Sequence, residues 1–292
     1  MAVTQNISVP APDRHVVGDV VWIGSSAASS SVITAAIRAA RLDSSLLLTG
    51  ERGSGKRLLA RMVHAYSTRR DAPFVDLDQT GTEDSVADCF ERAGRGIVYV
   101  DRIDQRPPDV QKRLIHVMGS GPFLRPRLIA SSCRDLRIEA RAGRVSDRLL
   151  HLLGTQLEVP PLRKRATDIA KLASHFQSKG NGEAAGFSAE ALQALERYDW
   201  PGNVRELRSV VESLRATGKP IELTELPSDI TQRSRSLDPE AMTLSAMERQ
   251  HIQRVLRLTG GRLTRAAELL GIHRNTLRRK LDQYGITGTD TE

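Results

Sequence analysis

The stretch Leu46-Leu47-Leu48-Thr49-Gly50-Glu51-Arg52-Gly53-Ser54-Gly55-Lys56 decides the fold of this chain. Three consecutive leucines favour a short buried strand, and the glycines that follow favour a tight turn. Residues 58–66 then carry apolar side chains at helical spacing. The stretch therefore predicts a strand, a glycine-rich loop and a helix in immediate succession, which is the unit from which parallel sheets are built.

The loop has the pattern Gly50-x-x-x-x-Gly55-Lys56. In this setting the glycines let backbone amides approach phosphate oxygens, the helix N-terminus adds positive potential, and the lysine meets the β- and γ-phosphates. The alternative for so short a pattern is a glycine-rich turn with an exposed lysine, but the strand before it and the helix after it favour a nucleotide site. The usual Ser or Thr after the lysine is Arg57 here, so one Mg²⁺ ligand of the general motif is missing.

Strands and helices alternate on both sides of this loop. Apolar runs predict further strands at 74–77, 97–100 and 127–130, and helical patterns cover 31–41 and 110–118. Buried strands that alternate with helices predict an α/β fold with a parallel sheet covered on both faces. After Pro160-Pro161 the strands nearly stop and three helices are expected, at 167–177, 188–198 and 204–216, the second with Ser188 as N-cap.

The chain divides into five expected parts. Residues 1–19 carry prolines and small polar side chains and are expected to form a flexible arm. The α/β region covers 20–160, a helical region covers 161–230, and a polar linker of alternating charge covers 231–242. A final all-helical block covers 243–287.

Composition excludes several classes of protein. The chain has 292 residues with a formal net charge of +8, which favours a polyanionic partner if the charge is localised. It has no apolar run of membrane-spanning length and no secretory pattern at its start, so we expect a cytoplasmic protein without a membrane partner. Its only cysteines, Cys89 and Cys133, lie in unrelated contexts, and we expect neither a disulfide framework nor a protein-ligated metal cluster.

The C-terminal block has the pattern of a helix-turn-helix. Gly260 and Gly261 end a first helix at 244–258, whose apolar face we assign to Leu244, Met247, Ile252, Val255 and Leu256. Ala266, Ala267, Leu269 and Leu270 are expected to form the inner face of a short second helix. Gly271 permits a sharp turn, Ile272 fills the corner, and Leu277 and Leu281 bury a third helix, which is presented to the major groove in this motif.

The outward face of the third helix is basic. Between Arg262 and Lys280 there are six Lys or Arg residues and one acid. Such side chains neutralise phosphates, and arginine reads guanine edges bidentately. The alternative is an ordinary basic surface helix, but the glycine turn and the alanine pair fit one motif. The residues expected to contact DNA are Thr264, His273, Arg274, Asn275, Thr276, Arg278, Arg279 and Lys280.

The stretch TRAAELLGIHRNTLRRKL, residues 264–281, closely resembles the signature of the Fis-type DNA-binding domain. This resemblance implies that the basic side chains of the third helix face double-stranded DNA. It also implies homodimers on partly palindromic sites, with the 244–258 helix helping to pair the subunits.

Residues 20 to about 230 resemble the AAA+ domain of the bacterial enhancer-binding proteins, the sigma-54-dependent activators. The resemblance rests on the segments LLLTGERGSGKRLLARMVH (46–64), GIVYVDRID (96–104), RLIASSCRDL (127–136), VPPLRKRATDIAKLASHF (159–176) and YDWPGNVRELRSVVE (198–212), in the family's order. It implies ATP as cofactor, with Mg²⁺ held through Asp101. The nucleotide-binding residues that follow from the loop and the resemblance are Ile23, Gly24, Gly50, Gly53, Ser54, Gly55, Lys56, Arg57, Asp101 and Arg205.

Departures from the family pattern fall on the catalytic positions. Arg102 stands where the family has the glutamate that polarises the attacking water, and an arginine cannot act as a base. Cys133 replaces the asparagine of the sensor strand. The two arginine-finger positions align with Val145 and His151, and their loss is costly because the finger stabilises charge on the transferring phosphoryl group. We therefore assign no catalytic residue.

The family's GAFTGA loop, which contacts sigma-54, is also missing. Only TGTEDSVADCFERAGR, residues 80–95, lies between the strand at 74–77 and the one at 97–100. We therefore expect no remodelling of the sigma-54 holoenzyme.

Three hypotheses about function stay open. The first, which the motifs favour most, is a transcription regulator that binds DNA without sigma-54 and whose AAA+ domain does not hydrolyse ATP efficiently. The second is an active ATPase that remodels another partner, which needs an acid such as Asp104 as base and Arg144 or Arg148 as finger. The third is an antagonist that caps oligomers of an intact AAA+ relative.

Overall fold

The computed structural model describes residues 14–17, 20–77, 83–119, 126–178, 186–214, 219–231, 244–284 and 286. Its contacts divide the chain into two units, Met1–Pro227 and Ser228–Glu292. Each unit is described here by itself. The expected linker, 231–242, lies outside the described residues except for Thr231.

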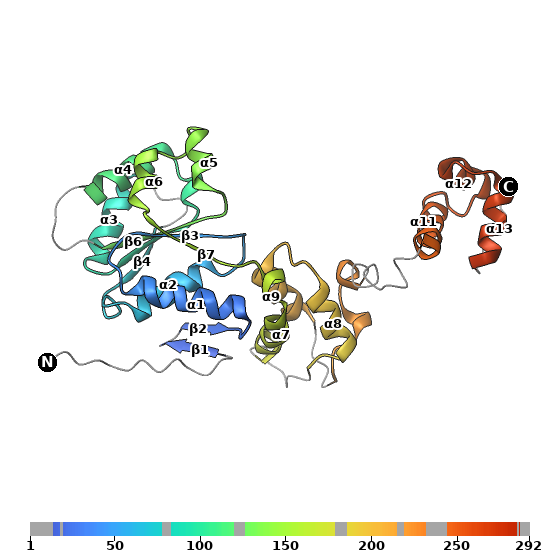
Figure 1. Cartoon of the computed structure of the whole chain (residues 1–292), viewed down its shortest axis with the longest axis horizontal. Helices are drawn as coiled ribbons and strands as arrows, with labels where there is room; N and C mark the ends of the chain where they lie inside the picture. Colours follow the sequence, from blue (N-terminus) through green and yellow to red (C-terminus); the bar gives the residue numbers. More distant parts are fainter. Residues whose placement is uncertain are drawn as a thin grey trace. The chain divides into compact units, whose positions relative to one another are not determined.

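A five-stranded sheet forms the centre of the first unit (Figure 1). All its strand pairs are parallel, and the spatial order is β4-β5-β6-β3-β7. The strands are β3 (Leu46–Thr49), β4 (Phe74–Leu77), β5 (Ile97–Val100), β6 (Arg127–Ser132) and β7 (Thr155–Glu158). The prediction of a parallel α/β sheet is confirmed, and the strands expected at 74–77 and 97–100 have the expected bounds.

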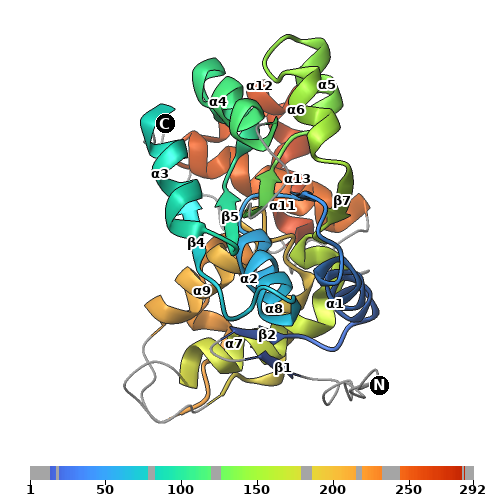
Figure 2. The ribbon, with the colours of Figure 1, turned by 90° about the vertical axis from the view of Figure 1, so that its left-hand side faces the viewer.

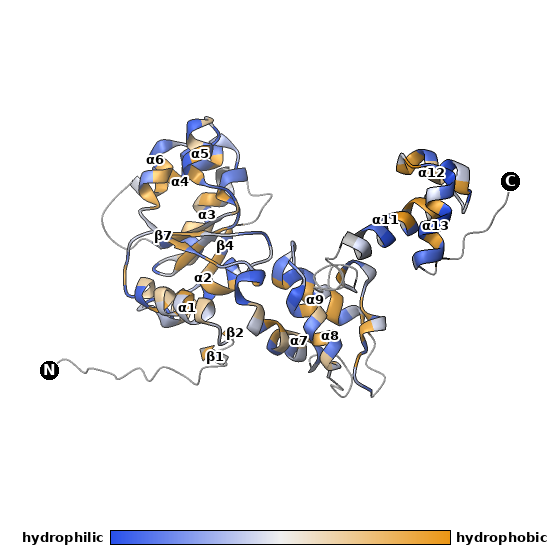
Figure 3. Ribbon diagram, turned by 45° about the vertical axis from the view of Figure 1, so that its right-hand side comes forward, coloured by the Kyte–Doolittle hydropathy of each residue, from blue (hydrophilic) through white to orange (hydrophobic). Residues whose placement is uncertain are grey.

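Helices cover both faces of the sheet because its strands are apolar on both sides. Helices α1 (Ala27–Ala40) and α2 (Lys56–Tyr66) pack with Leu46, Leu48 and Tyr99 on one face. On the other face, alternate strand residues such as Leu47 and Val98 meet the remaining helices of the α/β region. These are α3 (Glu83–Ala93), α4 (Pro108–Gly119), α5 (Leu136–Arg141) and α6 (Asp147–Leu152). Figure 3 shows the strands largely in hydrophobic colours, whereas the outer helices alternate.

Helix boundaries differ from the predicted ones where side chains cap the ends. The helix expected from residue 31 begins at Ala27 because the hydroxyl of Ser26 accepts a hydrogen bond from the backbone N–H of Ser29. Ser188 caps the N-terminus of its helix as expected, accepting from the N–H of Ala191.

Part of the segment expected to be a flexible arm forms a strand. Strand β1 (Arg14–Val17) pairs antiparallel with β2 (Val20–Ile23), and the hairpin lies against α2 (Figure 2). Trp22 anchors it, since its side chain is 2% exposed within the cluster of α1 and α2. The hydrophobic burial of this indole explains why the chain is ordered before the first expected helix.

The helical region after the sheet belongs to the first unit. It contains α7 (Ile169–Ser178), α8 (Ala189–Arg197) and α9 (Asn203–Ser213), with 3-10 turns at Leu162–Asp168 and Leu223–Glu225. A third 3-10 turn, Ile103–Gln105, follows β5. We call this helical region the lid. Trp200 is fully buried in it and donates its indole N–H to the carbonyl of Leu195.

The second unit contains α11 (Leu244–Leu258), α12 (Leu263–Leu270) and α13 (Arg274–Tyr284). Its core holds the apolar residues Ile252, Val255, Leu256, Leu263, Ala266, Ala267, Leu277 and Leu281. Gly271 ends α12 in the left-handed conformation, with φ +66°, as the turn requires. One expectation is wrong: Leu269, placed on the inner face of α12, is 64% exposed because that face is formed by Leu263, Ala266 and Ala267.

Candidate functional site

A cavity of about 580 Å³ lies in the first unit where the glycine-rich loop meets the hairpin and the lid. Seven of the described residues that line it are arginine or lysine, and one, Asp101, is an acid. The cations are Arg52, Lys56, Arg57, Arg102, Arg165, Arg205 and Arg208. Such a wall favours an anionic ligand.

The loop residues at Gly53 and Gly55 have φ of +78° and +105°, which only glycine adopts readily. A Cβ on Gly53 would lie 2.2 Å from the carbonyl oxygen of Gly202, so the lid presses directly on the loop. Helix α2 begins at Lys56, and the amides of its first turn have no acceptor within the helix. The loop thus presents backbone donors and the positive end of a helix to the cavity.

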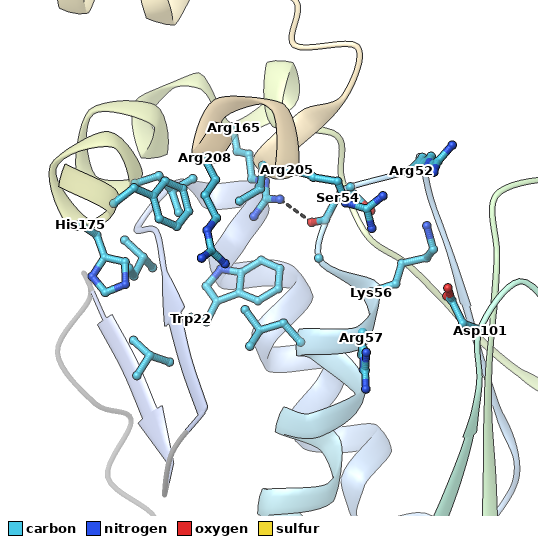
Figure 4. A pocket seen from close by; sticks show the side chains of 18 of the residues that line it. Trp22, Arg52, Ser54, Lys56, Arg57, Asp101, Arg165, His175, Arg205 and Arg208 are labelled. Carbon is cyan, nitrogen blue, oxygen red and sulfur yellow. Dashed lines mark hydrogen bonds between the residues drawn. The ribbon is translucent and has the colours of Figure 1, made fainter. Parts of the chain in front are cut away.

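Lys56 is 7% exposed and its ammonium group donates to the carbonyl oxygens of Gly50 and Glu51, both at 2.8 Å. It also lies 3.3 Å from the sulfur of Cys133. Figure 4 shows Lys56 and Asp101 facing the same end of the cavity, with Trp22, His175 and Arg208 at the other end.

Most of the predicted nucleotide-binding residues come together at this cavity. Those that line it are Ile23, Gly53, Ser54, Gly55, Lys56, Arg57, Asp101 and Arg205. Gly24 and Gly50 do not line it. At each of them the absence of a side chain lets the backbone lie close to another part of the unit. A Cβ on Gly24 would lie 2.5 Å from the carboxylate of Asp168, and one on Gly50 would lie 2.6 Å from the carbonyl oxygen of Val159.

The side chain of Arg57 turns away from the cavity. Its guanidinium lies 2.6 Å from the carboxylate of Asp76 at the end of β4, and Figure 4 shows it directed away from Lys56. Arg57 therefore contributes an ion pair on the surface of α2.

Asp101 follows β5, and the residues around it occupy its carboxylate. One oxygen accepts hydrogen bonds from the hydroxyls of Ser131 at 2.6 Å and Tyr99 at 3.2 Å. The other oxygen lies 3.8 Å from the guanidinium Nε of Arg102. Arg102 itself has φ +50°, a left-handed conformation that is strained for an arginine and that recurs at functional sites.

Asp104, the acid nearest to the lost glutamate, does not line the cavity. It is 6% exposed, and one of its oxygens accepts a hydrogen bond from the hydroxyl of Ser132 at 3.0 Å. A base must reach the water that it activates, so this position does not serve as the missing glutamate.

Neither residue at the two arginine-finger positions is an arginine, and the two nearby arginines lie outside the wall of the nucleotide cavity. Val145 is 3% exposed in the hydrophobic core, whereas His151 is exposed. Arg144 forms a bidentate pair with the buried Glu139, at 2.5 and 3.1 Å. Arg148 is exposed and lines a separate cavity with Lys112, Ile115, His116 and Gly119.

The lid is fixed to the phosphate loop through Glu51. Arg163 donates to both carboxylate oxygens of Glu51, at 2.5 and 2.8 Å, and Asn203 donates to one of them at 3.1 Å. The side chain of Asn203 also accepts from the backbone N–H of Leu162 at 2.7 Å. The hydrogen bonds from Arg163 lower the pKa of Glu51 to about 2.

Trp22 and Arg165 form the wall near the hairpin, and no sequence motif identifies either residue. The guanidinium of Arg165 lies over the Trp22 ring, 4.9 Å from its centroid, and donates to the carbonyl of Ser54 at 2.7 Å. Burial lowers the pKa of Arg165 to about 10, so it stays cationic at neutral pH. Because the two residues are 143 positions apart, no local pattern could have linked them.

Asp168 joins the lid to the start of α1. Its two oxygens accept hydrogen bonds from the backbone N–H groups of Ser25 and Ser26 and from the hydroxyls of Ser26 and Ser29, at 2.6 to 2.8 Å. The side chain is fully buried. The hydroxyl of Ser29 also accepts from the indole N–H of Trp22 at 3.3 Å, so this contact positions one wall of the cavity.

The residues present fit a nucleotide. The hydroxyl of Ser54 and the Nε of Arg165 are buried polar atoms of the cavity wall without a hydrogen-bond partner in the described structure. They suit a polar ligand, and the glycine loop suits phosphates.

The same residues do not fit the Mg²⁺ that accompanies nucleotides in such folds. That ion takes oxygen ligands at short distances, usually one or two carboxylates besides phosphates. Here the single carboxylate in the described wall is bound by Ser131 and Tyr99 and faces Arg102. Arg57 offers no oxygen, and Cys133 offers a soft thiol.

In the second unit, the basic face of α13 is open to solvent. The expected DNA-contacting residues that are exposed are Thr264, His273, Arg274, Asn275, Arg278 and Arg279. His273 precedes α13 and its Nδ1 accepts a hydrogen bond from the backbone N–H of Asn275 at 3.3 Å, so the ring caps the helix. Thr276 is half-buried.

Lys280 is also half-buried, and its ammonium group lies 2.5 Å from the carboxylate of Glu248 on α11. The other oxygen of Glu248 accepts from the hydroxyl of Tyr284 at 2.6 Å. These contacts lower the pKa of Glu248 and raise that of Tyr284. Lys280 therefore joins two helices of the unit, unlike the exposed arginines beside it.

The described residues contain neither a membrane-spanning helix nor a cluster of metal-binding side chains. No helix there is long and apolar enough to cross a membrane. No group of three or more His, Cys, Asp or Glu side chains is arranged to hold a metal ion in that part of the chain.

Models of three protein families match consecutive stretches of the chain. The sigma-54 interaction domain matches residues 23–162, the AAA+ ATPase lid domain matches 163–243, and the model of the bacterial regulatory proteins of the Fis family matches 243–284. Their order is the one expected from the motifs.

Relatives match over nearly the whole chain. The DNA-binding transcriptional regulator NtrC of Rhizobium meliloti is 31% identical over 91% of this chain and 70% of its own length. The transcriptional regulatory protein ZraR of Salmonella typhimurium is 33% identical over 89% of this chain and 68% of its own.

Solved structures of NtrX from Brucella abortus are also similar. The complex with ADP has 27% sequence identity and the complex with ATP has 26%, each with a TM-score of 0.66 over 90% of this chain and 69% of theirs. The matches run through the phosphate loop, the lid and the helix-turn-helix in one order, and they show that the chain belongs to the family of NtrC- and ZraR-type transcriptional regulators with an AAA+ domain.

Proposed function

We propose that this protein is a sequence-specific DNA-binding transcription regulator that acts without sigma-54. Its AAA+ domain binds adenine nucleotide but does not turn it over efficiently. The observation that carries the proposal is a contrast between the two units. The reading face of α13 is basic and exposed, whereas Arg102 occupies the position of the catalytic glutamate.

DNA binding is supported by the architecture of the second unit. Gly271 turns the chain between α12 and α13, and the buried Leu277 and Leu281 leave Arg274, Arg278 and Arg279 outward. Arginines at such positions contact phosphates or guanine edges in the major groove. The relative NtrC of Rhizobium meliloti is a DNA-binding transcriptional regulator, which agrees with this proposal. We propose that the protein binds partly palindromic sites as a homodimer or a higher homo-oligomer, as the resemblance to the Fis-type domain implies.

The test is binding to promoter fragments recovered by genome-wide mapping of bound sites. The wild-type chain is expected to bind them with salt-sensitive affinity. Arg274→Ala and Arg278→Ala should each weaken binding, and a lost phosphate contact should reduce the salt slope by about one unit. Arg141→Ala, at an exposed arginine of α5, is the matched control and should leave binding unchanged. The absence of salt-sensitive affinity in the wild type would refute this function.

Nucleotide binding is supported by the cavity at the phosphate loop and by the NtrX structures in complex with ADP and ATP. Inefficient turnover is supported by three side chains. Arg102 replaces a base, Cys133 lies 3.3 Å from Lys56 where the family has an amide, and Val145 is buried in the core. The loss of a base, a water-positioning amide and a finger together removes most of the stabilisation of the transition state.

Independence from sigma-54 is supported by the connection between β4 and β5. Helix α3 fills most of that connection, and its sequence contains no GAFTGA motif. Transcription of a bound promoter in extracts with and without sigma-54 tests this point, and equal regulation in both is expected.

The second candidate, an active ATPase acting on another partner, has weaker support. Asp104 is buried outside the cavity wall, and Arg144 is paired with Glu139. One observation favours this second function: Arg148 is exposed, so it could act as an arginine finger toward the nucleotide of a neighbouring subunit. Steady ATP turnover that Lys56→Ala abolishes would establish this function.

A further inference from the structure

The phosphate end of the cavity carries positive charge at the place where this fold usually holds a divalent cation. Asp101 is the single carboxylate of the described wall, and Arg102 lies beside it, 3.8 Å from one of its oxygens. A second cation placed there would lie next to the guanidinium and be repelled by it. The charge that normally comes from a metal ion is already present in the chain.

We propose that the cavity binds an adenine nucleotide without a divalent metal ion, with Arg102 supplying the positive charge beside the terminal phosphate. This inference rests on the nucleotide binding proposed above and names the form in which the ligand enters. The ligand class is a free nucleoside di- or triphosphate.

The position of Arg102 suits this role. Its backbone N–H donates to the hydroxyl of Ser131 at 3.0 Å, and the same hydroxyl donates to Asp101 at 2.6 Å. These bonds fix the turn after β5 in its left-handed conformation. The ion pair with Asp101 keeps the guanidinium, whose side chain is 29% exposed, at the cavity wall. A guanidinium held in place loses little entropy when it binds phosphate, and it offers a planar, bidentate donor.

The opposite wall completes the arrangement. The ammonium group of Lys56 donates to the carbonyl oxygens of Gly50 and Glu51. Both acceptors are neutral, so a phosphate oxygen can replace one of them when the nucleotide binds. Arg205 and Arg52 also line the cavity. A free polyphosphate carries more negative charge than its magnesium complex, so a wall of side-chain cations attracts the free form more strongly.

The test is calorimetric titration of the full chain with ADP and with ATP, in EDTA and in excess Mg²⁺. The wild-type affinity in EDTA is expected to equal or exceed that in Mg²⁺. Arg102→Asn removes the positive charge and introduces a side chain that tolerates the left-handed conformation. This variant should bind nucleotide in EDTA about tenfold more weakly or worse. Arg102→Glu should reverse the preference, so that Mg²⁺ strengthens binding.

Two controls separate this effect from general charge and from folding. Arg70→Glu makes the same change at an exposed arginine outside the cavity and should leave the ratio of the two affinities unchanged. Tryptophan fluorescence, to which Trp22 in the cavity wall contributes, measures nucleotide binding by a second method besides calorimetry.

Wild-type binding that requires Mg²⁺, or no binding in either buffer, would overturn the inference. An unchanged ratio of affinities in Arg102→Glu would overturn the role of this arginine. Binding of promoter DNA is measured separately on the same variants, so a failure here is distinguishable from a failure of the proposed regulator function.

Discussion

Arg163 holds both carboxylate oxygens of Glu51, at 2.5 and 2.8 Å, and thereby joins the lid to the phosphate loop. Glu51 lies inside the Gly50-to-Lys56 loop, so a contact of the lid is built into the phosphate-binding element itself. Any movement of the lid away from the sheet must break this pair and the hydrogen bond from Asn203.

The Glu51–Arg163 pair should make stability depend on pH in the acid range. Hydrogen bonds from Arg163 lower the pKa of Glu51 in the folded protein to about 2, from its ordinary value of 4.5. Its contribution is therefore fully present above about pH 4.5 and is lost as the pH falls through about 2. Both side chains are about two-fifths exposed, so the contribution is expected to be below about 1 kcal/mol.

Urea denaturation of Glu51→Gln between pH 7 and pH 3 measures this effect. The variant should be less stable than the wild type at pH 7, and the difference should shrink toward pH 3. Glu91→Gln, at an exposed glutamate of α3, serves as the control. A difference that grows on acidification would contradict the assigned pair.

Asp168→Ala should destabilise the first unit strongly. Four donors from the start of α1 would lose their acceptor in a fully buried site, which costs about 3 kcal/mol or more. For a unit of this size the melting temperature should fall by about 6 to 12 °C. Asp168→Asn should cost less, because one amide oxygen still accepts and the serine hydroxyls can rotate to accept from its NH₂ group.

Thermal denaturation followed by circular dichroism checks this order of stability. Asp109→Ala, at a residue whose side chain is 75% exposed, is the control and should change the melting temperature little. Equal melting temperatures for Asp168→Ala and the wild type would refute the role of this contact.

Neighbouring cations of α13 should behave differently on substitution. Lys280 lies 2.5 Å from Glu248, whereas Arg279 is exposed. Arg279→Ala should reduce the salt dependence of DNA binding by about one unit and leave folding unchanged. Lys280→Ala should lower the stability of the helix-turn-helix and change the salt slope less.

Measurement of DNA affinity at several salt concentrations, paired with thermal denaturation, distinguishes the two variants. Tyr284→Phe removes the second contact of Glu248 without a change of charge and should share the loss of stability. If Lys280→Ala and Arg279→Ala change the salt slope equally, Lys280 contacts phosphate despite its ion pair.

Arg102→Glu alone should not restore ATP hydrolysis. The finger position is occupied by Val145, which is 3% exposed in the core, and Cys133 stands in place of an amide. Phosphate release by this variant should stay at the rate of Lys56→Ala. Release that exceeds that rate and disappears in the double variant would show that the glutamate was the only missing group.

The local parts of the fold were predictable from sequence. The strand at 97–100 is a short apolar run buried along its whole length, and the strand at 74–77 carries three apolar residues beside it at the edge of the sheet. Short apolar runs of this kind predict strands of a buried parallel sheet. Strand β7 (Thr155–Glu158) escaped prediction because it is polar at the edge of the sheet, with Leu157 its single buried residue. The hairpin of β1 and β2 escaped it because its order depends on burial of Trp22 against α2.

The candidate site divides in the same way. The phosphate loop is continuous in sequence, so its glycines and Lys56 were identified together. Trp22, Arg163 and Asp168 reach the site from segments more than 100 residues from the partners that they contact, and helical or strand periodicity carries no information about such pairs.

The sequence by itself determined which chemical groups are present: a phosphate loop, Arg102 and Cys133 at catalytic positions, no GAFTGA motif, and a basic third helix. Only the tertiary structure decided how those groups are used. It directs Arg57 to Asp76, Arg144 to Glu139 and Lys280 to Glu248, and leaves Arg102 at the cavity wall. The physical reason is that a flexible charged side chain turns toward an opposite charge near it. Folding brings together such partners as Arg57 and Asp76 or Lys280 and Glu248, which lie far apart in the sequence.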